Sequence, residues 1–207
     1  MTLLEPFNHD SLRNQLMGMN SDHSLAFGVA CCERLLPGYE LFCAKAGWGN
    51  PEELRRILTL IGRQCWRRDL DRVQIQALSL GCEKAAPDSE DFDFLYTATA
   101  QDTVAAICQL LKFLDDSDID HIVNAAQYVT DSIDLIVQEV VDMDPGDPEL
   151  ETKILSHPLM QNELRRQERD IKDLQTSPEL APESLQGFIS RSQEEQALRS
   201  NDEHPSP

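Results

Sequence analysis

Eight side chains in the first half of the sequence have the chemistry of a small-molecule pocket. They comprise four carboxylates, one guanidinium and three aromatic rings: Glu33, Arg34, Tyr39, Trp48, Asp91, Asp93, Tyr96 and Asp102. A few charged groups that converge between helices are typical of a ligand site, so we expect a candidate pocket here. The alternative is that Glu33 and Arg34 form a structural ion pair and that Tyr39 is an aromatic residue of the core.

A second group of side chains forms a long acidic run. Between Lys112 and Lys153 the chain contains no lysine or arginine but holds twelve aspartates and glutamates. An acidic helix face can recruit a basic protein or imitate the charge of DNA. We take Asp131, Asp134 and Glu139 as the candidate interaction face. The alternative is a solvated surface that is partly neutralised by a cluster of basic residues: Arg55, Arg56, Arg63, Arg67, Arg68 and Arg72.

The sequence contains no motif that predicts catalysis or a bound metal. Residues 116–121 begin like a calcium loop, but His121 stands where the loop needs glycine and Gln127 where it needs a bidentate glutamate. The five histidines include no pair at the i, i+4 spacing of a zinc helix, and there is no CxxC. The adjacent Cys31 and Cys32 fit core packing better than a reactive thiol. We therefore expect no catalytic residue, no metal ligand and no cofactor.

Length and charge limit the classes of partner. The chain has 207 residues, of which 41% are hydrophobic and 27% charged, as expected for one globular domain. The formal net charge of -19 argues against a general binder of nucleic acid or of an anionic membrane. No uncharged apolar run approaches the roughly 18 residues of a membrane span, and residues 1–10 lack a signal-peptide pattern. We expect a cytoplasmic protein with free thiols.

The spacing of apolar residues predicts an all-α fold, a compact bundle of about seven or eight helices. The clearest segment is 51–67, in which Asn50 can cap the helix and Pro51 suits its first position. Other helices are expected over residues 21–36, 39–46, 71–85, 92–111, 118–141 and 149–174. Pro37 and Gly38 are expected to separate the first two, and the His157-Pro158 step to bend or break the last. Asp118 is the expected cap of segment 118–141.

The composition changes after Thr176. Residues 177–207 are rich in Pro, Ser and Glu and have too few apolar residues for a core. We therefore divide the chain into a single helical domain, 1–176, and a mostly disordered C-terminal tail, 177–207. Leu185, Phe188 and Ile189 leave an alternative open, in which one amphipathic turn docks on the domain or on a partner.

Three blocks of sequence carry a resemblance to a known family. They are CERLLPGYELFC (32–43) with GWGN (47–50) and RRIL (55–58), then EKAAP (83–87) with DFD (91–93), Tyr96 and Asp102, then HPL (157–159) with Glu163 and Gln167. Across roughly residues 21–175 the chain resembles the YjaG-like family of bacterial proteins of unknown function. The resemblance implies a compact multi-helical bacterial domain and no established activity, so it assigns no residue a role. The tail after Thr176 departs from the family pattern.

These observations favour a non-enzymatic module that binds a protein partner or a second copy of itself. The contacts would be made by the acidic helices or by the neighbourhood of Glu33, Arg34, Tyr39 and Trp48. The competing interpretation is an enzyme, or a protein that binds a small molecule or a metal, with the interhelical pocket as its site.

Overall fold

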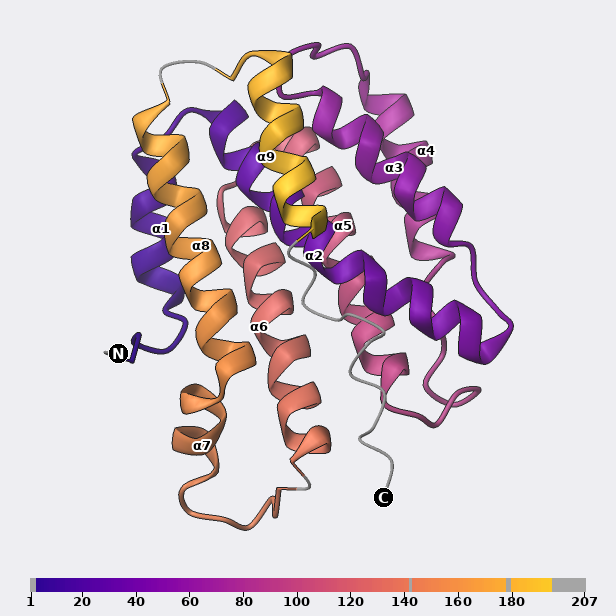
Figure 1. The fold of residues 1–207 in the computed structure, drawn as a ribbon. Helices are drawn as coiled ribbons and strands as arrows, with labels where there is room; N and C mark the ends of the chain where they lie inside the picture. The colour runs from indigo at the N-terminus through magenta and orange to yellow at the C-terminus, as the bar shows by residue number, and fades with distance from the viewer. Residues whose placement is uncertain (1–2, 142, 178–179, 195–207) are drawn as a thin grey trace.

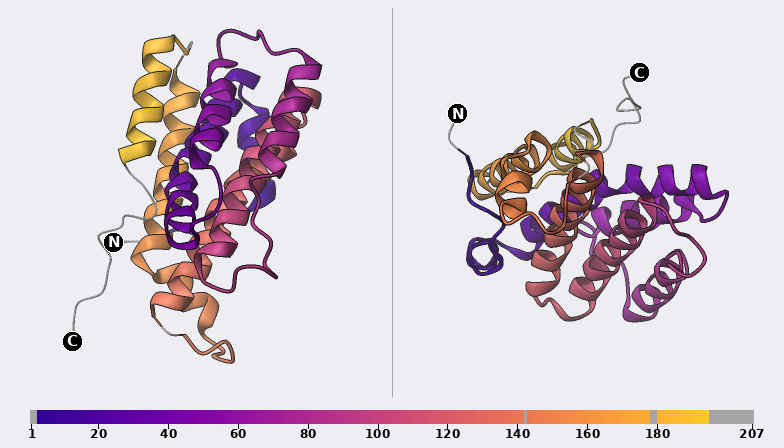
Figure 2. Two further views of the ribbon diagram at one scale, coloured as in Figure 1. Left: turned by 90° about the vertical axis from the view of Figure 1, so that its right-hand side faces the viewer. Right: turned by 90° about the horizontal axis from the view of Figure 1, so that it is seen from below.

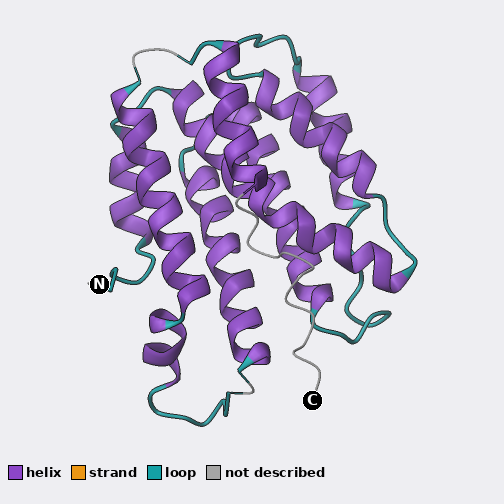
Figure 3. Cartoon of the chain, viewed as in Figure 1, coloured by secondary structure: helices purple, strands orange, loops and turns teal. Residues whose placement is uncertain are grey.

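The computed structural model describes residues 3–141, 143–177 and 180–194, and within these ranges the chain is helical without any strand (Figures 1 and 3). The helices are α1 (His9–Met17), α2 (Ser21–Ala46), α3 (Pro51–Arg63), α4 (Arg72–Glu83), α5 (Tyr96–Asp116), α6 (Asp120–Val140), α7 (Leu150–Ser156), α8 (Pro158–Thr176) and α9 (Pro182–Glu194). The all-α prediction is confirmed. None of the helices in these ranges has the length and apolar character needed to cross a membrane.

Helix α2 is the centre of the bundle. Every residue from His23 to Tyr39 is buried, which is the pattern of a helix that is surrounded on all sides. Helices α3, α5, α6, α8 and α9 all pack against it. Figure 2 shows α8 and α9 on one side of α2. Because α2 contacts most of the other elements, a side chain on α2 can reach partners that are far apart in the sequence.

The expected helix break at Pro37 is wrong. Helix α2 runs through Pro37 without interruption, although proline removes the N–H that would bond to the carbonyl of Glu33. Figure 1 shows α2 changing direction along its length, as helices with an internal proline do. The helix continues because the residues on both sides of Pro37 are buried in the core, and this packing outweighs the local penalty.

The predicted cap at Asn50 is confirmed, since its side chain accepts a hydrogen bond from the Glu53 N–H. The helix predicted to begin at Asp71 begins at Arg72, and Asp71 caps it in a reciprocal capping box with Gln74. The chain also breaks as expected between Ser156 and Pro158, which separates α7 from α8.

Two predicted helix starts need correction. Helix α5 begins at Tyr96, so Phe92 lies in the preceding loop, where its ring packs 5.2 Å from that of Phe42. That packing holds the segment in place without helical hydrogen bonds. At the start of α6, Ile119 is the residue before the helix, and the Asp118 carboxylate accepts a hydrogen bond from the Asp120 N–H at 3.1 Å.

The described part of the expected tail contains a docked helix. Helix α9 packs against α2, with Leu185 fully buried and Phe188 buried, and Ile189 packs against the core beside them. Residues 182–194 are therefore docked on the domain, which was the alternative to disorder in this part of the tail. Within the tail, residues 178–179 and 195–207 lie outside the described residues.

A close helix approach at Gly28 gives a test of the packing. A Cβ atom added to Gly28 of α2 would lie 2.5 Å from Leu110 Cδ2 and 3.1 Å from Ile122 Cδ1, whereas one added to Gly187 of α9 would have no neighbour within 4 Å. We expect Gly28→Ala to lower the free energy of unfolding by about 1 to 3 kcal/mol through overpacking. Gly187→Ala should raise it by about 0.5 to 1 kcal/mol through helix propensity. Urea unfolding measures both, and equal effects of the two substitutions would contradict the close approach.

Candidate functional site

The eight candidate pocket residues do not line one common pocket. Glu33 and Arg34 are buried on α2 and bind different partners. Tyr39, Trp48 and Tyr96 belong to an aromatic cluster, while Asp102 faces α6. The remaining two, Asp91 and Asp93, are exposed in the loop before α5.

Arg34 is the most buried charge among these residues. Its guanidinium is 0% exposed and binds two carboxylates of α8: Nε donates to Glu163 Oε1 at 3.0 Å and NH1 donates to Asp170 Oδ2 at 2.8 Å. Both carboxylates are also 0% exposed. Burial alone would lower the pKa of Arg34, but the charges of Glu163 and Asp170 raise it, so the guanidinium stays protonated.

Further basic residues surround these carboxylates. Asp170 Oδ1 accepts hydrogen bonds from Arg169 and from Arg191 of α9, each at 3.0 Å. Gln167 Nε2 donates to Glu163 Oε1 at 3.2 Å. The Arg34 guanidinium is therefore paired with both carboxylates and the cluster is closed over by α9, while Glu163 Oε2 and Arg191 Nε are buried without a hydrogen bond to the described residues. Such a cluster joins helices and offers no open position for a substrate.

Glu33 and Arg34 do not form an ion pair with each other. The Glu33 carboxylate accepts hydrogen bonds from Arg55 of α3 and, at 3.1 Å, from Gln193 of α9. Glu33 is only 3% exposed. The two neighbouring charges of α2 thus connect it to different helices, in arrangements that serve packing.

The aromatic candidates form a continuous cluster around Phe42. The Phe42 ring centroid lies 6.2 Å from that of Tyr39, 6.0 Å from Trp48 and 5.5 Å from Phe94. The Tyr39 hydroxyl donates to the Ala85 carbonyl at 2.8 Å, so this ring is a satisfied core residue. Trp48 is the exposed edge of the cluster at 39%.

Asp102 is a partly buried carboxyl between two helices. Burial raises its pKa to about 6, against a hydrogen bond that Ser132 Oγ donates to Asp102 Oδ2 at 2.8 Å and that favours the ionised form. Asp102 lies on α5 and Ser132 on α6. Its titration is therefore linked to the contact between these helices.

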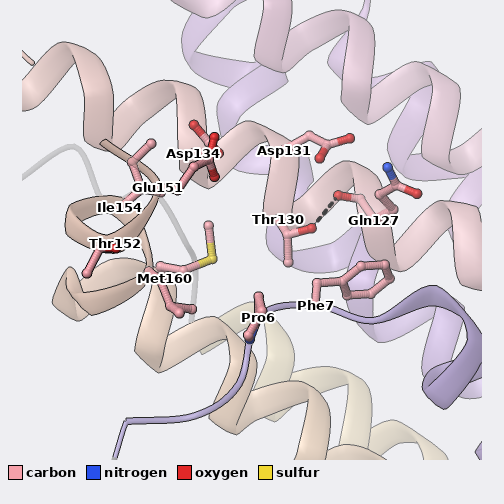
Figure 4. Close-up of a pocket in the computed structure, with 11 residues that line it drawn as sticks. Pro6, Phe7, Gln127, Thr130, Asp131, Asp134, Glu151, Thr152, Ile154 and Met160 are labelled. Atoms are coloured by element: carbon pink, nitrogen blue, oxygen red, sulfur yellow. Dashed lines mark hydrogen bonds between the residues drawn. The ribbon is translucent and has the colours of Figure 1, made fainter. Parts of the chain in front are cut away.

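The structure places two residues of the candidate acidic face in a cavity. A cavity of about 420 Å³ is lined by residues of the N-terminal segment and of α6, α7 and α8: Pro6, Phe7, Gln127, Thr130, Asp131, Asp134, Glu151, Thr152, Ile154, Leu155 and Met160. Figure 4 shows Asp131 and Asp134 on one wall, opposite Phe7 and Met160. The acidic cavity thus has carboxylates on one side and apolar groups on the other.

The electrostatics of the acidic cavity favour a cation. Its lining contains three carboxylates, those of Asp131, Asp134 and Glu151, and no lysine or arginine. Partial burial raises the pKa of Asp131, and the negative charge of Asp134 raises it further. A positive group that entered the cavity would relieve this repulsion. The described residues contain no group of three or more His, Cys, Asp or Glu side chains that could hold a metal ion.

Glu139, the third residue of the acidic face, lies apart from this cavity. It lines a different hollow of about 440 Å³ with Lys45, Phe94, Leu95 and Tyr96. There the ammonium of Lys45 lies 4.8 Å from the centroid of the Tyr96 ring. Glu139 therefore shares its surroundings with a cation, unlike Asp131 and Asp134.

Sequence reasoning missed several residues of the acidic cavity. Glu151 belongs to the acidic run, so its charge was visible, but nothing in its spacing connected it with Asp131. Phe7 and Met160 gave no signal, because they lie far from α6 in the chain and only folding brings them to the cavity.

Comparisons with known proteins agree on one family. The family described as "Protein of unknown function (DUF416)" matches residues 11–201. The chain is 26% identical over 137 residues to the uncharacterized protein YjaG of Escherichia coli K12, covering 66% of this chain and 69% of that protein. It is 24% identical over 139 residues to YjaG of Salmonella typhimurium, covering 67% and 70%.

A solved structure shares the fold. A DUF416 family protein from Shewanella baltica OS155 superposes with a TM-score of 0.80 at 23% sequence identity, covering 88% of this chain and 93% of that one. At this identity the likeness concerns the fold.

The Arg34 cluster gives a stability prediction. We expect Arg34→Met to lower the free energy of unfolding by about 3 to 5 kcal/mol, because it leaves two buried carboxylates without their central cation. Arg56→Met is the matched control, since Arg56 pairs with Glu53 at the surface and its loss should cost at most about 1 kcal/mol. Urea unfolding followed by circular dichroism measures both. A similar cost for the two variants would contradict a central role for Arg34.

Asp102 gives a prediction of pH dependence. Its pKa in the folded state, about 6, is above the ordinary aspartate value of 3.8, so ionising it opposes folding. We expect Asp102→Asn to be more stable than the native chain above pH 6, and this advantage to vanish as the pH falls to 3.8. Denaturant midpoints across this range measure the difference. A constant difference at every pH would refute the link between Asp102 and folding.

Proposed function

The chain belongs to the DUF416 family of proteins of unknown function, and we propose that it acts as a non-enzymatic binding module whose acidic cavity receives a basic segment of a protein partner. The observation that carries this proposal is the lining of the cavity, with three carboxylates and no basic residue beside apolar side chains. A lysine or arginine side chain has a matching structure, an apolar stem that ends in a positive charge.

Ion pairing within the protein supports this choice of surface. The first part of the acidic run is already neutralised, since Arg72 pairs with Asp115 at 2.9 Å and Arg13 pairs with Asp120 at 2.6 Å. Within the described ranges, no ion pair neutralises Asp131 or Asp134. Their partners on α6 are neutral side chains, Gln127 for Asp131 and Gln138 for Asp134.

One exposed apolar residue of α6 adds apolar contact area beside the cavity. Leu135 is 39% exposed and directly follows Asp134 on this helix. Exposed apolar side chains beside a strongly charged group are common at protein interfaces. A partner segment with alternating basic and apolar residues would match both features.

A small-molecule cation is the alternative occupant. The cavity volume of about 420 Å³ lies within the range of ligand pockets, and its mixed walls would suit a linear aliphatic amine.

As part of the proposal we assign the protein to the bacterial cytoplasm, because its six cysteines are free thiols, which suits a reducing compartment.

A defined peptide tests the proposal on the full chain. The probe is a labelled peptide of alternating lysine and leucine, and its counterpart carries glutamate in place of lysine. We expect the lysine peptide to bind and the glutamate peptide not to bind. Asp131→Asn with Asp134→Asn should weaken binding at least about tenfold, equivalent to about 1.4 kcal/mol, because the cavity loses the charges that attract the peptide. Fluorescence anisotropy measures the affinity.

The matched control separates the cavity from net charge. Glu52→Gln with Glu90→Gln removes the same charge from exposed positions outside the cavity, and we expect it to change the affinity less than about twofold. Equal weakening in both double variants would mean that only the overall charge attracts the peptide. Direct binding of 1,5-diaminopentane, measured by calorimetry, with no measurable peptide affinity would favour the small-molecule alternative.

A further inference from the structure

Two cysteines that are distant in the sequence meet between α4 and α5. Cys82 is in the last turn of α4 and Cys108 is near the middle of α5, and these helices pack directly on each other. Each thiol shifts the pKa of the other, so the two side chains lie within interaction distance. The binding proposal uses neither residue.

A backbone contact places the same two residues together independently. Cys82 Sγ lies 3.6 Å from the carbonyl oxygen of Val104, fully buried. In an α-helix this carbonyl accepts the N–H of the residue four positions later, which is Cys108. The Cys82 sulfur therefore lies beside the turn of α5 from which the Cys108 side chain projects.

Solvent reaches the edge of this pair. Cys108 is only partly buried, whereas Cys82 is 0% exposed. The charged neighbours Glu83 and Lys112, both of which act on Cys108, also line a cavity of about 420 Å³ between α4 and α5. A small oxidant can thus approach from the side of Cys108 and not from that of Cys82.

We propose that Cys82 and Cys108 form a reversible, hydroperoxide-sensitive redox pair that cross-links α4 to α5. Cys108 is the attacking thiol because it is the accessible one, and Cys82 is the resolving thiol because it is buried against Cys108. The chemical class of the co-reactant is a hydroperoxide, with hydrogen peroxide as its simplest member.

The local charges agree with these roles. The hydrogen bond from Cys82 lowers the pKa of Cys108, and Lys112 lowers it further, while burial and Glu83 oppose them. The same hydrogen bond and burial raise the pKa of Cys82. Cys108 is therefore the thiol that more readily becomes the nucleophilic thiolate.

The chemistry balances in two steps. The Cys108 thiolate attacks one peroxide oxygen, so an S–O bond forms, the O–O bond breaks, and the leaving hydroxide takes up a proton to become water. The Cys82 sulfur then attacks the Cys108 sulfur. An S–S bond forms, the S–O bond breaks, and the hydroxide leaves as a second water with the proton of Cys82. The two thiols lose two electrons and the peroxide gains them, and a thiol reductant reverses the reaction by exchange.

Two other cysteines provide controls. Cys32 of α2 is fully buried and lies near the pair, since it raises the pKa of Cys82 and its own pKa is raised by Cys108. Cys65 is buried at the end of α3, and burial raises its pKa to about 12. Neither is expected to oxidise, Cys32 because it has no access to solvent and Cys65 because it has no thiol partner and remains protonated.

Peptide mapping by mass spectrometry tests the proposal on the reduced full chain treated with hydrogen peroxide. We expect a Cys82–Cys108 linkage with the loss of two hydrogens, reversed by dithiothreitol. Cys108→Ala should slow peroxide consumption at least about tenfold. Cys82→Ala should leave Cys108 as a sulfenic acid that dimedone captures. Cys65→Ala and Cys32→Ala should leave the linkage unchanged.

Two results would overturn the proposal. One is a folded protein in which Cys82 and Cys108 stay reduced while peroxide is consumed elsewhere. The other is a linkage that forms only in urea, which would place the thiols together in the unfolded chain alone. Circular dichroism of each variant establishes that it is folded before oxidation, so a loss of the linkage is not confused with unfolding.

Discussion

The fold depends on one buried cation. Arg34 lies at the centre of α2 with no contact to water, and its charge is balanced by Glu163 and Asp170 of α8. Removing a guanidinium from water is costly unless carboxylates replace its hydration, so α8 must pack at one position and in one register. Arg191 of α9 shares Asp170 with Arg34, which fixes the C-terminal helix to the same point. Hydrophobic burial stabilises the bundle, and the Arg34 cluster joins α8 and α9 to α2.

Charged side chains of this protein occur in two kinds of environment. Buried charges are matched by opposite charges from other helices, as with Arg34 and Glu33. The carboxylates of Asp131 and Asp134 lie half in solvent beside neutral amides, with their charge left unbalanced. The first arrangement builds structure, whereas the second leaves an attractive field that reaches an approaching molecule. This contrast is why we locate the proposed binding activity at the acidic cavity and assign the Arg34 cluster to architecture.

Local sequence signals predicted most helices, and they failed where contacts between distant residues determine the structure. Asn50, Asp71 and the His157-Pro158 step marked helix boundaries because caps and prolines act within a few residues. The helix break predicted at Pro37 was wrong for the same reason, because a local rule does not include the burial of the residues on both sides of the proline. Helix α1 was not predicted, and α9 was left as one of two alternatives.

The candidate site was predictable only in part. Asp131 and Asp134 were predicted as interaction residues because the acidic run can be recognised in the sequence alone. Their companions Phe7 and Met160 approach from both sides of α6 in the sequence, so only the fold could assign them. The eight-residue pocket set had the right chemistry for a site, but its members face different helices. Adjacent residues of a helix do not face each other, so the spacing of Glu33 and Arg34 indicates different sides of α2, but it could not identify the partners.

The order of the Arg34 cluster along the chain has a consequence for synthesis. The ribosome makes Arg34 early and its partners Glu163, Asp170 and Arg191 late. Until α8 emerges, the guanidinium has no carboxylate to replace water, so the middle of α2 must remain hydrated while the helices between them are being made. Closure of the core around α2 is therefore a late event in the life of the nascent chain. During that interval the apolar residues of α2 that α8 and α9 later cover lack these partners.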